Sequence, residues 1–493
     1  MKQILTILLC ACALLTSCSR KAGLEAGNSA YTLEYTVTPN PEDKYLYVDL
    51  KYAPQGKRAG EMSLKMPVWA PGYYLIVDYP KNLADFEVKD EEGNPVNWRK
   101  EGKNEWIISE SDKPLNISWR TYAYERSVAE SRIEDDLAFI ATNGVFMFAD
   151  NNTDTPVTVT YNLPEAWEQK ITTALEKTGE NTFAAPDFDV LYDSPALLGK
   201  QRQDSFELDG HTYSIAMETP EGYDDCPFKE DIKKVIKAAT EMMGGVPYKD
   251  YSFIYLGGGG GGLEHQSCQA CYTSGSFNFA DRAAYLSFLS FATHEYFHNY
   301  NVKAIRPVEL GPFDYNREVF TPSLWISEGF TVYYESKLLE RAGLYTPQER
   351  LDDLSQYFRA IYTKEGHKHM SLRQSSYDIW LYFFNFLSDS QDVTISYYDK
   401  GPILGLLFDC RIQTLTDGEK SLDDLMRLLY SRFYVEKGRG FEEEEFWAAA
   451  EETAGSSLDD LRRYVETTDE IDFDSILTPC GITLDRETWH LSF

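Results

Sequence analysis

Positively charged residues are scarce in this chain of 493 residues. Lys and Arg number 47 against 79 Asp and Glu, so the formal charge at pH 7 is −32. A protein of that charge repels nucleic acid and anionic lipid, and neither is expected to bind it. Solubility explains the acidity more simply than a preference for a charged substrate. The length predicts two or three domains, each able to bury its own core.

Long apolar stretches are also lacking, except at the N-terminus. Residues 1–3 form a short basic segment, and residues 4–15 form an apolar segment that is too short to span a bilayer. A basic segment followed by a short apolar one is typical of a secretory signal. The segment Leu15-Thr16-Ser17-Cys18 resembles a bacterial lipobox, in which cleavage precedes the cysteine that carries the lipid. No later stretch is apolar enough to cross a membrane.

We therefore expect residues 1–17 to be a lipoprotein signal peptide and residues 18–29 to form a small, polar tether. Cys18 is the expected lipidation site, and its lipid would anchor the mature chain to a membrane. The expected location is the bacterial cell envelope, either periplasmic or at the outer membrane and cell surface. Cleavage near Ser17 without a lipid is the alternative.

Cysteine is too sparse for a disulfide framework. Of eight cysteines, five remain once the two in the signal and the lipidated Cys18 are set aside. The five are Cys226, Cys268, Cys271, Cys410 and Cys480. A single bridge between the neighbours Cys268 and Cys271 is an open possibility. His265 lies three residues before Cys268, but no fourth ligand follows at zinc-knuckle spacing, so a role outside metal binding is favoured for these cysteines.

The two halves of the mature chain differ in periodicity. Apolar and polar residues alternate over 31–38, 46–51 and 157–161, as in half-buried strands, and turn residues such as Asn40-Pro41 separate the strands. Residues 30–205 are therefore predicted to form an antiparallel β-sandwich-like domain. The rest, 206–493, is predicted to combine helices with a small sheet, which makes the protein an α+β multidomain chain.

Helices are predicted at three places in this second half. An apolar stripe marks residues 232–243, a long apolar helix is expected over 283–302, and another is expected over 327–342. A short strand at 251–256 runs into six consecutive glycines, Gly257 to Gly262. No Gly-Lys-Ser/Thr follows these glycines, so they do not form a phosphate-binding loop.

The sequence His294-Glu295-Tyr296-Phe297-His298 carries the strongest chemical signal. Residues four apart lie on one face of a helix, so both imidazoles can bind one metal ion. Glu295 would then reach a water molecule at the same ion and act as a general base. A catalytic zinc needs a third protein ligand and an open position.

Four glutamates downstream are candidates for the third ligand. Glu328 is favoured, because Ser327 can cap a helix that Glu328 would open, and a packed helix start holds a ligand rigidly. Glu309 and Glu318 lie in a loop and are expected to be solvated, while Glu335 is expected to be an ordinary residue or a support for a ligand. The prediction is one zinc ion held by His294, His298 and Glu328.

These motifs resemble those of the gluzincin zinc metallopeptidases, whose third ligand is the Glu of a helix similar to Trp325-Ile-Ser-Glu-Gly-Phe330. Here 29 residues separate His298 from Glu328, more than in aminopeptidase N and similar to the glycyl aminopeptidase family. Further similarity to that family lies at residues 66–74, 259–265, 301–307 and 397–401. The resemblance covers about residues 30–485 and implies a thermolysin-like catalytic domain, here assigned to 206–493.

The resemblance also implies substrate-binding residues. Gly261, Gly262 and Glu264 match a Gly-x-Met-Glu motif of related aminopeptidases, in which glycines admit the substrate backbone and the Glu binds the substrate's free amino group. Leu263 replaces the Met of that motif, and His265 replaces an Asn. The second replacement leaves recognition of the amine open.

Tyr398 matches the tyrosine that donates a hydrogen bond to the oxyanion of the transition state. A core aromatic ahead of a helix over 402–415 is the other reading of Tyr398, and its neighbour Tyr397 could take the same role. Only eight residues follow Asp485, so the PDZ domain that often ends this family is not expected.

The function implied is a zinc-dependent aminopeptidase that removes small N-terminal residues, Gly or Ala, from peptides. A zinc endopeptidase with an open cleft is the first alternative, and it would apply if Glu264 does not bind the amine. A non-catalytic lipoprotein with a structural metal is the second, although it would need neither Glu295 nor Tyr398.

Overall fold

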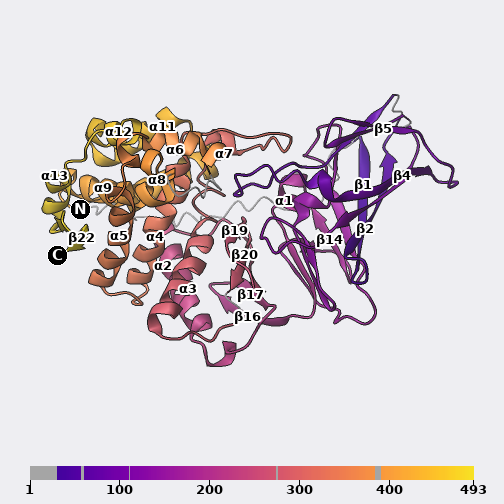
Figure 1. The fold of residues 1–493 in the computed structure, drawn as a ribbon, viewed down its shortest axis with the longest axis horizontal. Helices are drawn as coiled ribbons and strands as arrows, with labels where there is room; N and C mark the ends of the chain where they lie inside the picture. The colour runs from indigo at the N-terminus through magenta and orange to yellow at the C-terminus, as the bar shows by residue number, and fades with distance from the viewer. Residues whose placement is uncertain (1–29, 57–59, 110–111, 274–275, 383–389) are drawn as a thin grey trace, which may run out of the picture.

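The protein is described here by a computed structural model that covers residues 30–56, 60–109, 112–273, 276–382 and 390–493. The expected signal peptide, Cys18 and the tether lie outside these described residues. Two bodies lie side by side in Figure 1: a β-rich body from the N-terminal half and a largely helical body from the C-terminal half. This arrangement confirms the predicted α+β multidomain class.

The N-terminal body is built on a seven-stranded sheet in the order β13-β14-β11-β1-β2-β7-β4. These strands are β1 (Tyr31–Asn40), β2 (Tyr45–Pro54), β4 (Leu83–Asp90), β7 (Leu115–Tyr122), β11 (Val157–Tyr161), β13 (Glu176–Lys177) and β14 (Thr182–Ala185). Along β1 the predicted alternation holds, since Tyr31, Leu33, Tyr35 and Val37 are buried. The sheet is not wholly antiparallel, because β1 pairs with β11 in parallel.

Two four-stranded sheets complete this body, and residues of all three sheets share one hydrophobic core. The first has the order β10 (Phe148–Ala149), β3 (Met62–Lys65), β6 (Glu105–Ile108) and β5 (Trp98–Glu101). The second has the order β12 (Ile171–Thr173), β15 (Ala196–Gly199), β9 (Leu137–Ile140) and β8 (Arg132–Ile133). Short helical turns are η1 (Tyr79–Asn82), η2 (Thr142–Gly144) and α1 (Phe188–Tyr192).

The second body contains a mixed five-stranded sheet in the order β16-β17-β18-β20-β19. Its strands are β16 (Arg202–Leu208), β17 (His211–Met217), β18 (Tyr251–Gly257), β19 (Gly262–Glu264) and β20 (Cys268–Thr273). Strands β17, β18 and β20 run parallel, while β16 and β19 are antiparallel edge strands. The expected domain boundary at 205/206 lies within β16, and the change from one sheet to the next lies just before that strand.

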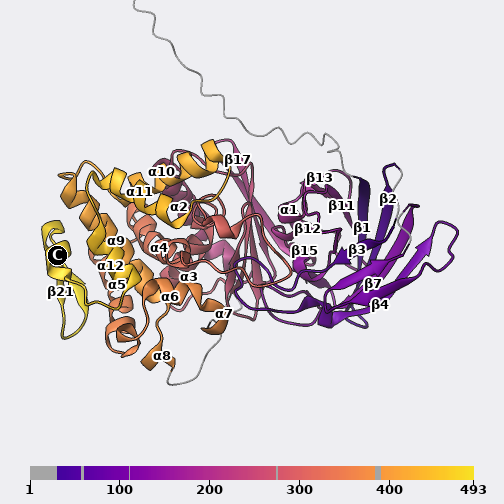
Figure 2. The ribbon, with the colours of Figure 1, turned by 90° about the horizontal axis from the view of Figure 1, so that it is seen from above.

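Helices pack against this sheet and against one another (Figure 2). The longer ones are α2 (Phe228–Met243), α3 (Arg282–Phe297), α4 (Phe330–Arg341), α5 (Pro347–Tyr362), α9 (Tyr397–Leu415), α10 (Leu422–Leu429), α11 (Glu443–Ala454) and α12 (Asp459–Glu466). The other helical segments are η3 (Tyr223–Asp225), η4 (Val308–Leu310), η5 (Trp325–Gly329), η6 (Gly366–Lys368), α6 (Leu372–Tyr377), α7 (Ile379–Tyr382), α8 (Ser390–Val393), η7 (Tyr430–Lys437), α13 (Phe473–Leu477) and η8 (Thr478–Cys480). A hairpin of β21 (Thr483–Asp485) and β22 (His490–Ser492) follows.

Several predicted helix limits were wrong. The helix expected over 283–302 ends at Phe297, and the one expected from Pro402 begins at Tyr397 with Ser396 as its N-cap. Ser327 is not an N-cap, because it lies inside η5, a π-helical turn that directly precedes α4. Among the described residues, no helix has the length and hydrophobicity needed to span a membrane.

The open possibility of a Cys268–Cys271 disulfide is excluded by the strand that carries both residues. They lie three positions apart on β20, so their side chains point to opposite faces of the sheet. Both are free thiols, and Gln269 Nε2 lies 3.3 Å from Cys271 Sγ.

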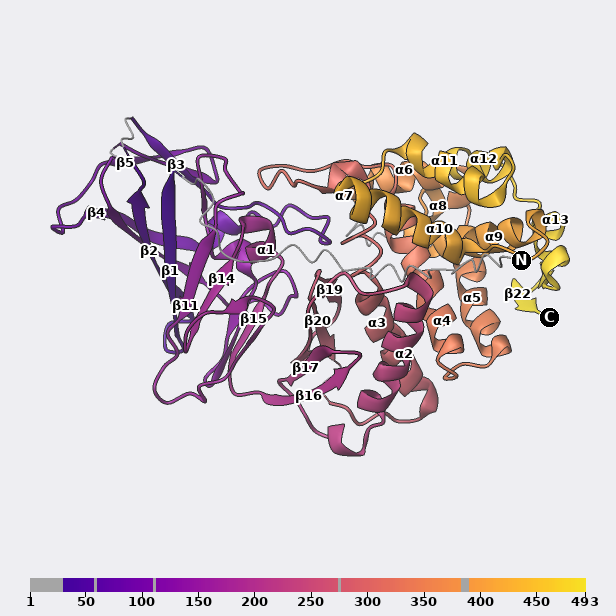
Figure 3. The ribbon, with the colours of Figure 1, turned by 180° about the vertical axis from the view of Figure 1, so that it is seen from behind.

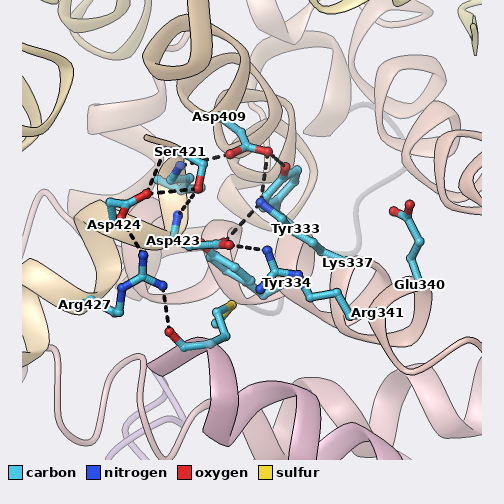
Figure 4. Close-up of polar contacts among 12 residues, drawn as sticks. Tyr333, Tyr334, Lys337, Glu340, Arg341, Asp409, Ser421, Asp423, Asp424 and Arg427 are labelled. Carbon is cyan, nitrogen blue, oxygen red and sulfur yellow. Dashed lines mark hydrogen bonds and ion pairs between the residues drawn. The ribbon is translucent and has the colours of Figure 1, made fainter. Parts of the chain in front are cut away.

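A buried ionic network joins α4 to α9 and α10 (Figure 4). Lys337 Nζ lies 2.9 Å from Asp409 Oδ2 and 3.1 Å from Asp423 Oδ1, and all three side chains are buried. Arg341 also pairs with Asp423, and Tyr333 donates its hydroxyl to Asp409 at 2.6 Å. Removing one member of such a network leaves a buried charge without a partner, so the network fixes α4 in position.

Candidate active site

Two histidines project from the last turn of α3. His294 Nε2 lies 3.0 Å from His298 Nε2, so the two rings face the same point. Their other nitrogens are held from behind: Glu335 Oε2 lies 2.9 Å from His294 Nδ1, and the Asn301 carbonyl lies 2.8 Å from His298 Nδ1. These partners select the tautomer that leaves both Nε2 lone pairs directed forward, as is usual for metal-binding histidines.

Glu328 joins the two histidines from the π-helical turn η5. Its Oε2 atom lies 3.1 Å from His298 Nε2 and 3.6 Å from His294 Nε2. Asn301 connects the two elements, because its side-chain amide donates to the carbonyls of Ile326 (2.8 Å) and Ser327 (2.9 Å). The turn after α3 thus fixes the segment that carries Glu328. Single π-helical turns are often found at functional sites.

The turn after α3 is also strained. Val302 has a φ of 111°, although it is β-branched, and its N–H donates to the Ile305 carbonyl at 2.9 Å. This conformation places the Asn301 carbonyl at His298 and the Asn301 side chain at η5. Strain of this kind persists where the surrounding structure fixes the backbone.

The three side chains form a donor set that suits a metal ion. Their ligand atoms lie within 4.8 Å of one another, and all three residues are buried. Glu328 Oε2 has no hydrogen-bond partner among the described residues. Burial opposes its charge, yet the histidines lower the pKa of Glu328 to about 2. Two imidazoles and one carboxylate, with space on one side, match the ligand set of a catalytic zinc site.

Glu295 lies beside this cluster, with Oε2 buried and without a hydrogen-bond partner among the described residues. Burial raises the pKa of Glu295 to about 7, against the lowering effect of His294 and His298. Gly262 packs directly on this carboxyl group, since a Cβ atom there would lie 2.3 Å from Glu295 Oε1. The glycine is therefore required for this close approach.

A cleft of about 1110 Å³ opens over the site. Its walls come from α3, α5, the start of α9 and the edge strand β19, and from residues 72–73 and 126–128 of the N-terminal body. Figure 3 shows β19 between the helices and the N-terminal body. His294, His298, Glu328, Glu295 and Tyr398 all line this cleft, so the fold brings together the predicted metal ligands, base and oxyanion donor.

The open edge of β19 faces the cleft. Tyr272 donates its N–H to the Gly261 carbonyl, and His265 donates to the Cys268 carbonyl, each at 2.9 Å. Hydrogen bonding alternates along an antiparallel pair, so the backbone groups of Gly262 and Glu264 point away from the sheet. An edge of this kind can pair with an extended chain.

Glu264 ends the edge strand and also lines the cleft. It is buried, and the N-terminal body covers it: a Cβ atom at Gly72 would lie 2.6 and 2.7 Å from its two carboxylate oxygens. Gly72 has a φ of +87°, so glycine is favoured there by its backbone as well as by this contact. The predicted amine-binding carboxylate therefore lies where the two bodies meet.

Asp193, a residue of the N-terminal body that the sequence did not single out, holds this junction. Its carboxylate accepts hydrogen bonds from the Gln266 N–H (2.7 Å) and Lys303 Nζ (2.9 Å), and it lies 3.0 Å from His265 Nδ1. One side chain thus connects the segment after Glu264 with the turn after α3. The sequence analysis could not identify Asp193, because it belongs to no motif and lies far in sequence from the residues that it contacts.

Tyr398 and its neighbour take different positions at the start of α9. Tyr398 lines the cleft, and its ring centroid is 6.5 Å from that of His294. Tyr397 is buried and does not line this cleft, although the two rings stack at 4.8 Å. Burial raises the pKa of Tyr398 well above its usual value, which keeps the hydroxyl protonated and able to donate.

The other candidates for a third ligand lie elsewhere. Glu309 is exposed and accepts a hydrogen bond from Thr321 Oγ1 at 3.2 Å, and Glu318 is exposed. Glu335 contacts Nδ1 of His294. Support for a ligand was one of the two roles expected for Glu335. Gly261 lines the cleft next to Gly262, with a φ of +88°.

Two family models match the chain. The Peptidase M61 N-terminal domain matches residues 34–200, and M61 glycyl aminopeptidase matches residues 287–404. The comparison with curated proteins finds no match.

Solved structures share the fold. An aminopeptidase N family protein from Idiomarina loihiensis has 23% identity and a TM-score of 0.85, over 92% of this chain and 79% of that one. Aminopeptidase A from Legionella pneumophila, in complex with aspartic acid, has 13% identity and a TM-score of 0.55, over 90% of this chain and 50% of that one. Yeast LTA4 hydrolase in complex with bestatin has 15% identity and a TM-score of 0.52, over 90% of this chain and 67% of that one.

At these identities the solved structures show a common fold, while the two family models carry the assignment. They match the β-rich N-terminal body and the segment that runs from the histidine-bearing helix to the start of α9. This confirms the resemblance seen in the sequence. The chain belongs to the M61 glycyl aminopeptidase family and is a peptide hydrolase.

Proposed function

We propose that this protein is a zinc-dependent aminopeptidase that removes small N-terminal residues, Gly or Ala, from peptides. The observation that carries the proposal is the cluster of His294, His298 and Glu328 in one cleft with Glu295 and Glu264. One zinc ion per chain, held by the three ligands, would supply Lewis-acid polarisation of the scissile carbonyl and of a water molecule.

Glu295 acts as the general base in this proposal. Its unpartnered oxygen is available to take a proton from the attacking water and to return it to the leaving amine. The contact with Gly262 limits the positions that its carboxyl group can take. Positioning of this kind contributes to rate because the reacting groups lose little freedom on the way to the transition state.

The substrate is held by the edge strand and by Tyr398. An extended peptide can pair with the outward backbone groups of Gly262 and Glu264. Such a peptide would lie along β19 and pass the metal ligands. Tyr398, protonated and facing the cleft, donates a hydrogen bond to the oxyanion that develops on the scissile carbonyl.

In this proposal, Glu264 restricts cleavage to the N-terminal residue of the substrate. Its buried carboxylate lies at the end of the edge strand, where Gly72 of the N-terminal body covers it. A substrate's free ammonium group would be a charged partner for this carboxylate, and a blocked amine would leave it unpaired. The preference for small residues rests on the family resemblance.

Free and N-acetylated glycyl and alanyl p-nitroanilides test the proposal, with zinc content measured in each preparation. Wild type should cleave only the free-amine substrates. Glu295→Gln should retain zinc and lose kcat by more than a hundredfold, on the order expected for a general base. Glu264→Gln should raise KM for free-amine substrates, while the exposed control Glu318→Gln should behave as wild type.

Equal cleavage of free and acetylated substrates would show an endopeptidase instead. Full activity of Glu295→Gln, or activity that persists without bound metal, would contradict the mechanism.

We also propose that the mature chain is anchored by a lipid on Cys18 in the bacterial cell envelope. The support is the lipobox-like segment, which lies outside the described residues. Metabolic labelling with a radioactive fatty acid should mark the mature protein, and Cys18→Ala should remove both the label and the membrane association. An unlabelled wild-type protein in the soluble fraction would refute the anchor.

A further inference from the structure

Two cysteines that are far apart in sequence meet at the helical end of the molecule. Cys410 lies on α9 and is only 2% exposed, while Cys480 is half-buried at the end of η8. Cys480 Sγ lies 3.5 Å from the backbone oxygen of Cys410 and 3.9 Å from Thr414 Oγ1, one helical turn further along α9. Cys480 thus sits over the turn of α9 that begins with Cys410.

The two thiols also differ in reactivity. Their interaction lowers the pKa of Cys480 and raises that of Cys410, which burial raises further. The more accessible sulfur is therefore the more acidic one. The thiolate is the attacking group in thiol–disulfide exchange, so a lowered pKa and greater exposure both favour attack by Cys480.

We propose that Cys410 and Cys480 are a site of disulfide formation, which ties the C-terminal segment to α9. The Cys480 thiolate attacks one sulfur of an oxidant of the disulfide class, forms a mixed disulfide and releases one thiol. The Cys410 thiolate then attacks Cys480 Sγ and releases the second thiol. The two cysteine thiols are oxidised to one S–S bond with loss of two protons, and the oxidant is reduced to two thiols.

The other described cysteines do not offer this geometry. Cys268 and Cys271 point to opposite faces of β20, and both lie in the core of the sheet. Cys226 lies just before α2, and no hydrogen bond joins it to another cysteine among the described residues. Burial raises the pKa of all three thiols, which disfavours their thiolates.

The bond would hold together the part of the chain that follows α9. Residues 410 and 480 enclose the segment with α10, α11, α12 and α13, and η8 packs against α9. The hairpin after η8 packs on α5, where Leu491 N–H donates to Ser355 Oγ at 2.9 Å. Figure 2 shows this segment at the end of the molecule opposite the N-terminal body. Closing a long loop in this way restricts the unfolded chain.

Peptide mapping tests the proposal directly on the full chain. After equilibration with oxidised glutathione, alkylation and tryptic digestion without reductant, residues 401–411 and 464–486 should appear as one cross-linked species. Reduction should separate them. Recovery of both peptides as alkylated thiols, or a link from Cys480 to any other cysteine, would overturn the proposal.

Thermal unfolding provides the second measurement. Oxidised wild type should melt roughly 5 °C above the reduced form, because a disulfide of this loop length is worth a few kcal/mol. Cys480→Ser should remove the difference, and the matched control Cys226→Ser should keep it. A redox-dependent shift that persists in Cys480→Ser would overturn the assignment. The mapping needs no variant, so it remains decisive if a substitution prevents folding.

Discussion

The contact between Gly262 and Glu295 leads to a sharp prediction for Gly262→Ala. An added Cβ atom would lie 2.3 Å from Glu295 Oε1, 2.5 Å from its Cδ and 2.8 Å from Phe291 Cζ. Cβ atoms rarely come within about 3 Å of another heavy atom, so the carboxyl group must move by roughly 0.7 Å or more. A displacement of about 1 Å at a reacting group can lower the rate by about 100-fold, or ~2.7 kcal/mol in the transition state.

The loss should appear in kcat, measured with glycyl and alanyl p-nitroanilides. Gly262 does not have a positive φ, so alanine fits its strand conformation, and Tm and zinc content should stay close to wild type. Gly260→Ala is the matched control, because a Cβ atom there meets nothing within 4 Å and its φ is also ordinary. A folded, zinc-loaded Gly262→Ala protein with kcat within twofold of wild type would show that the position of Glu295 does not limit the reaction.

Three further predictions follow from the site. Tyr398→Phe should lower kcat by about 10²–10³ with little change in KM or zinc content, whereas Tyr397→Phe should not, as steady-state kinetics will show. Glu335→Gln should weaken zinc binding about 10–100-fold in a chelator competition, and unchanged affinity would refute its role behind the first histidine. Partial burial opposes the charge of Asp193, whose side chain is 22% exposed, but Lys303 and His265 lower its pKa to about 2. Because the folded pKa lies below the unfolded one, Asp193 stabilises the fold above about pH 4 and loses this effect as pH falls towards 2. Asp193→Asn should therefore cost roughly 2 kcal/mol at pH 7 in urea unfolding, and this difference should shrink below pH 4; a pH-independent difference would contradict the assignment.

Much of the fold could be predicted because its signals are local. Alternation over 31–38 marked β1, and the spacing of His294 and His298 placed both on one helical face. Helix ends were less predictable: no Gly or Pro interrupts Ala283 to Val302, yet the helix ends at Phe297, before the turn at Val302. Likewise, serine is a common N-cap residue, but in the folded protein Ser327 is part of a π-helical turn.

Some residues of the candidate site could likewise be predicted from the sequence, and others could not. Glu328 could be chosen among four glutamates because of the residues around it, while the role of Glu335 at His294 could only be listed as one of two readings. Asp193 could not be found at all, and Gly72, although it lies in the family-like segment 66–74, could be given no role, since each acts on Glu264 or its neighbours across the junction of the two bodies. Nothing local to either residue reports a partner so distant in sequence.

The amino-acid sequence by itself determined the chemistry of this protein, because the two histidines, the base and the third carboxylate belong to short motifs with regular spacing. Tertiary structure alone decided what surrounds that chemistry. It brought Gly262 against Glu295, covered Glu264 with the N-terminal body, excluded the Cys268–Cys271 pair and placed Cys480 beside Cys410. The reason is physical: periodicity and spacing encode which face a side chain takes, whereas contacts between distant segments depend on how whole elements pack.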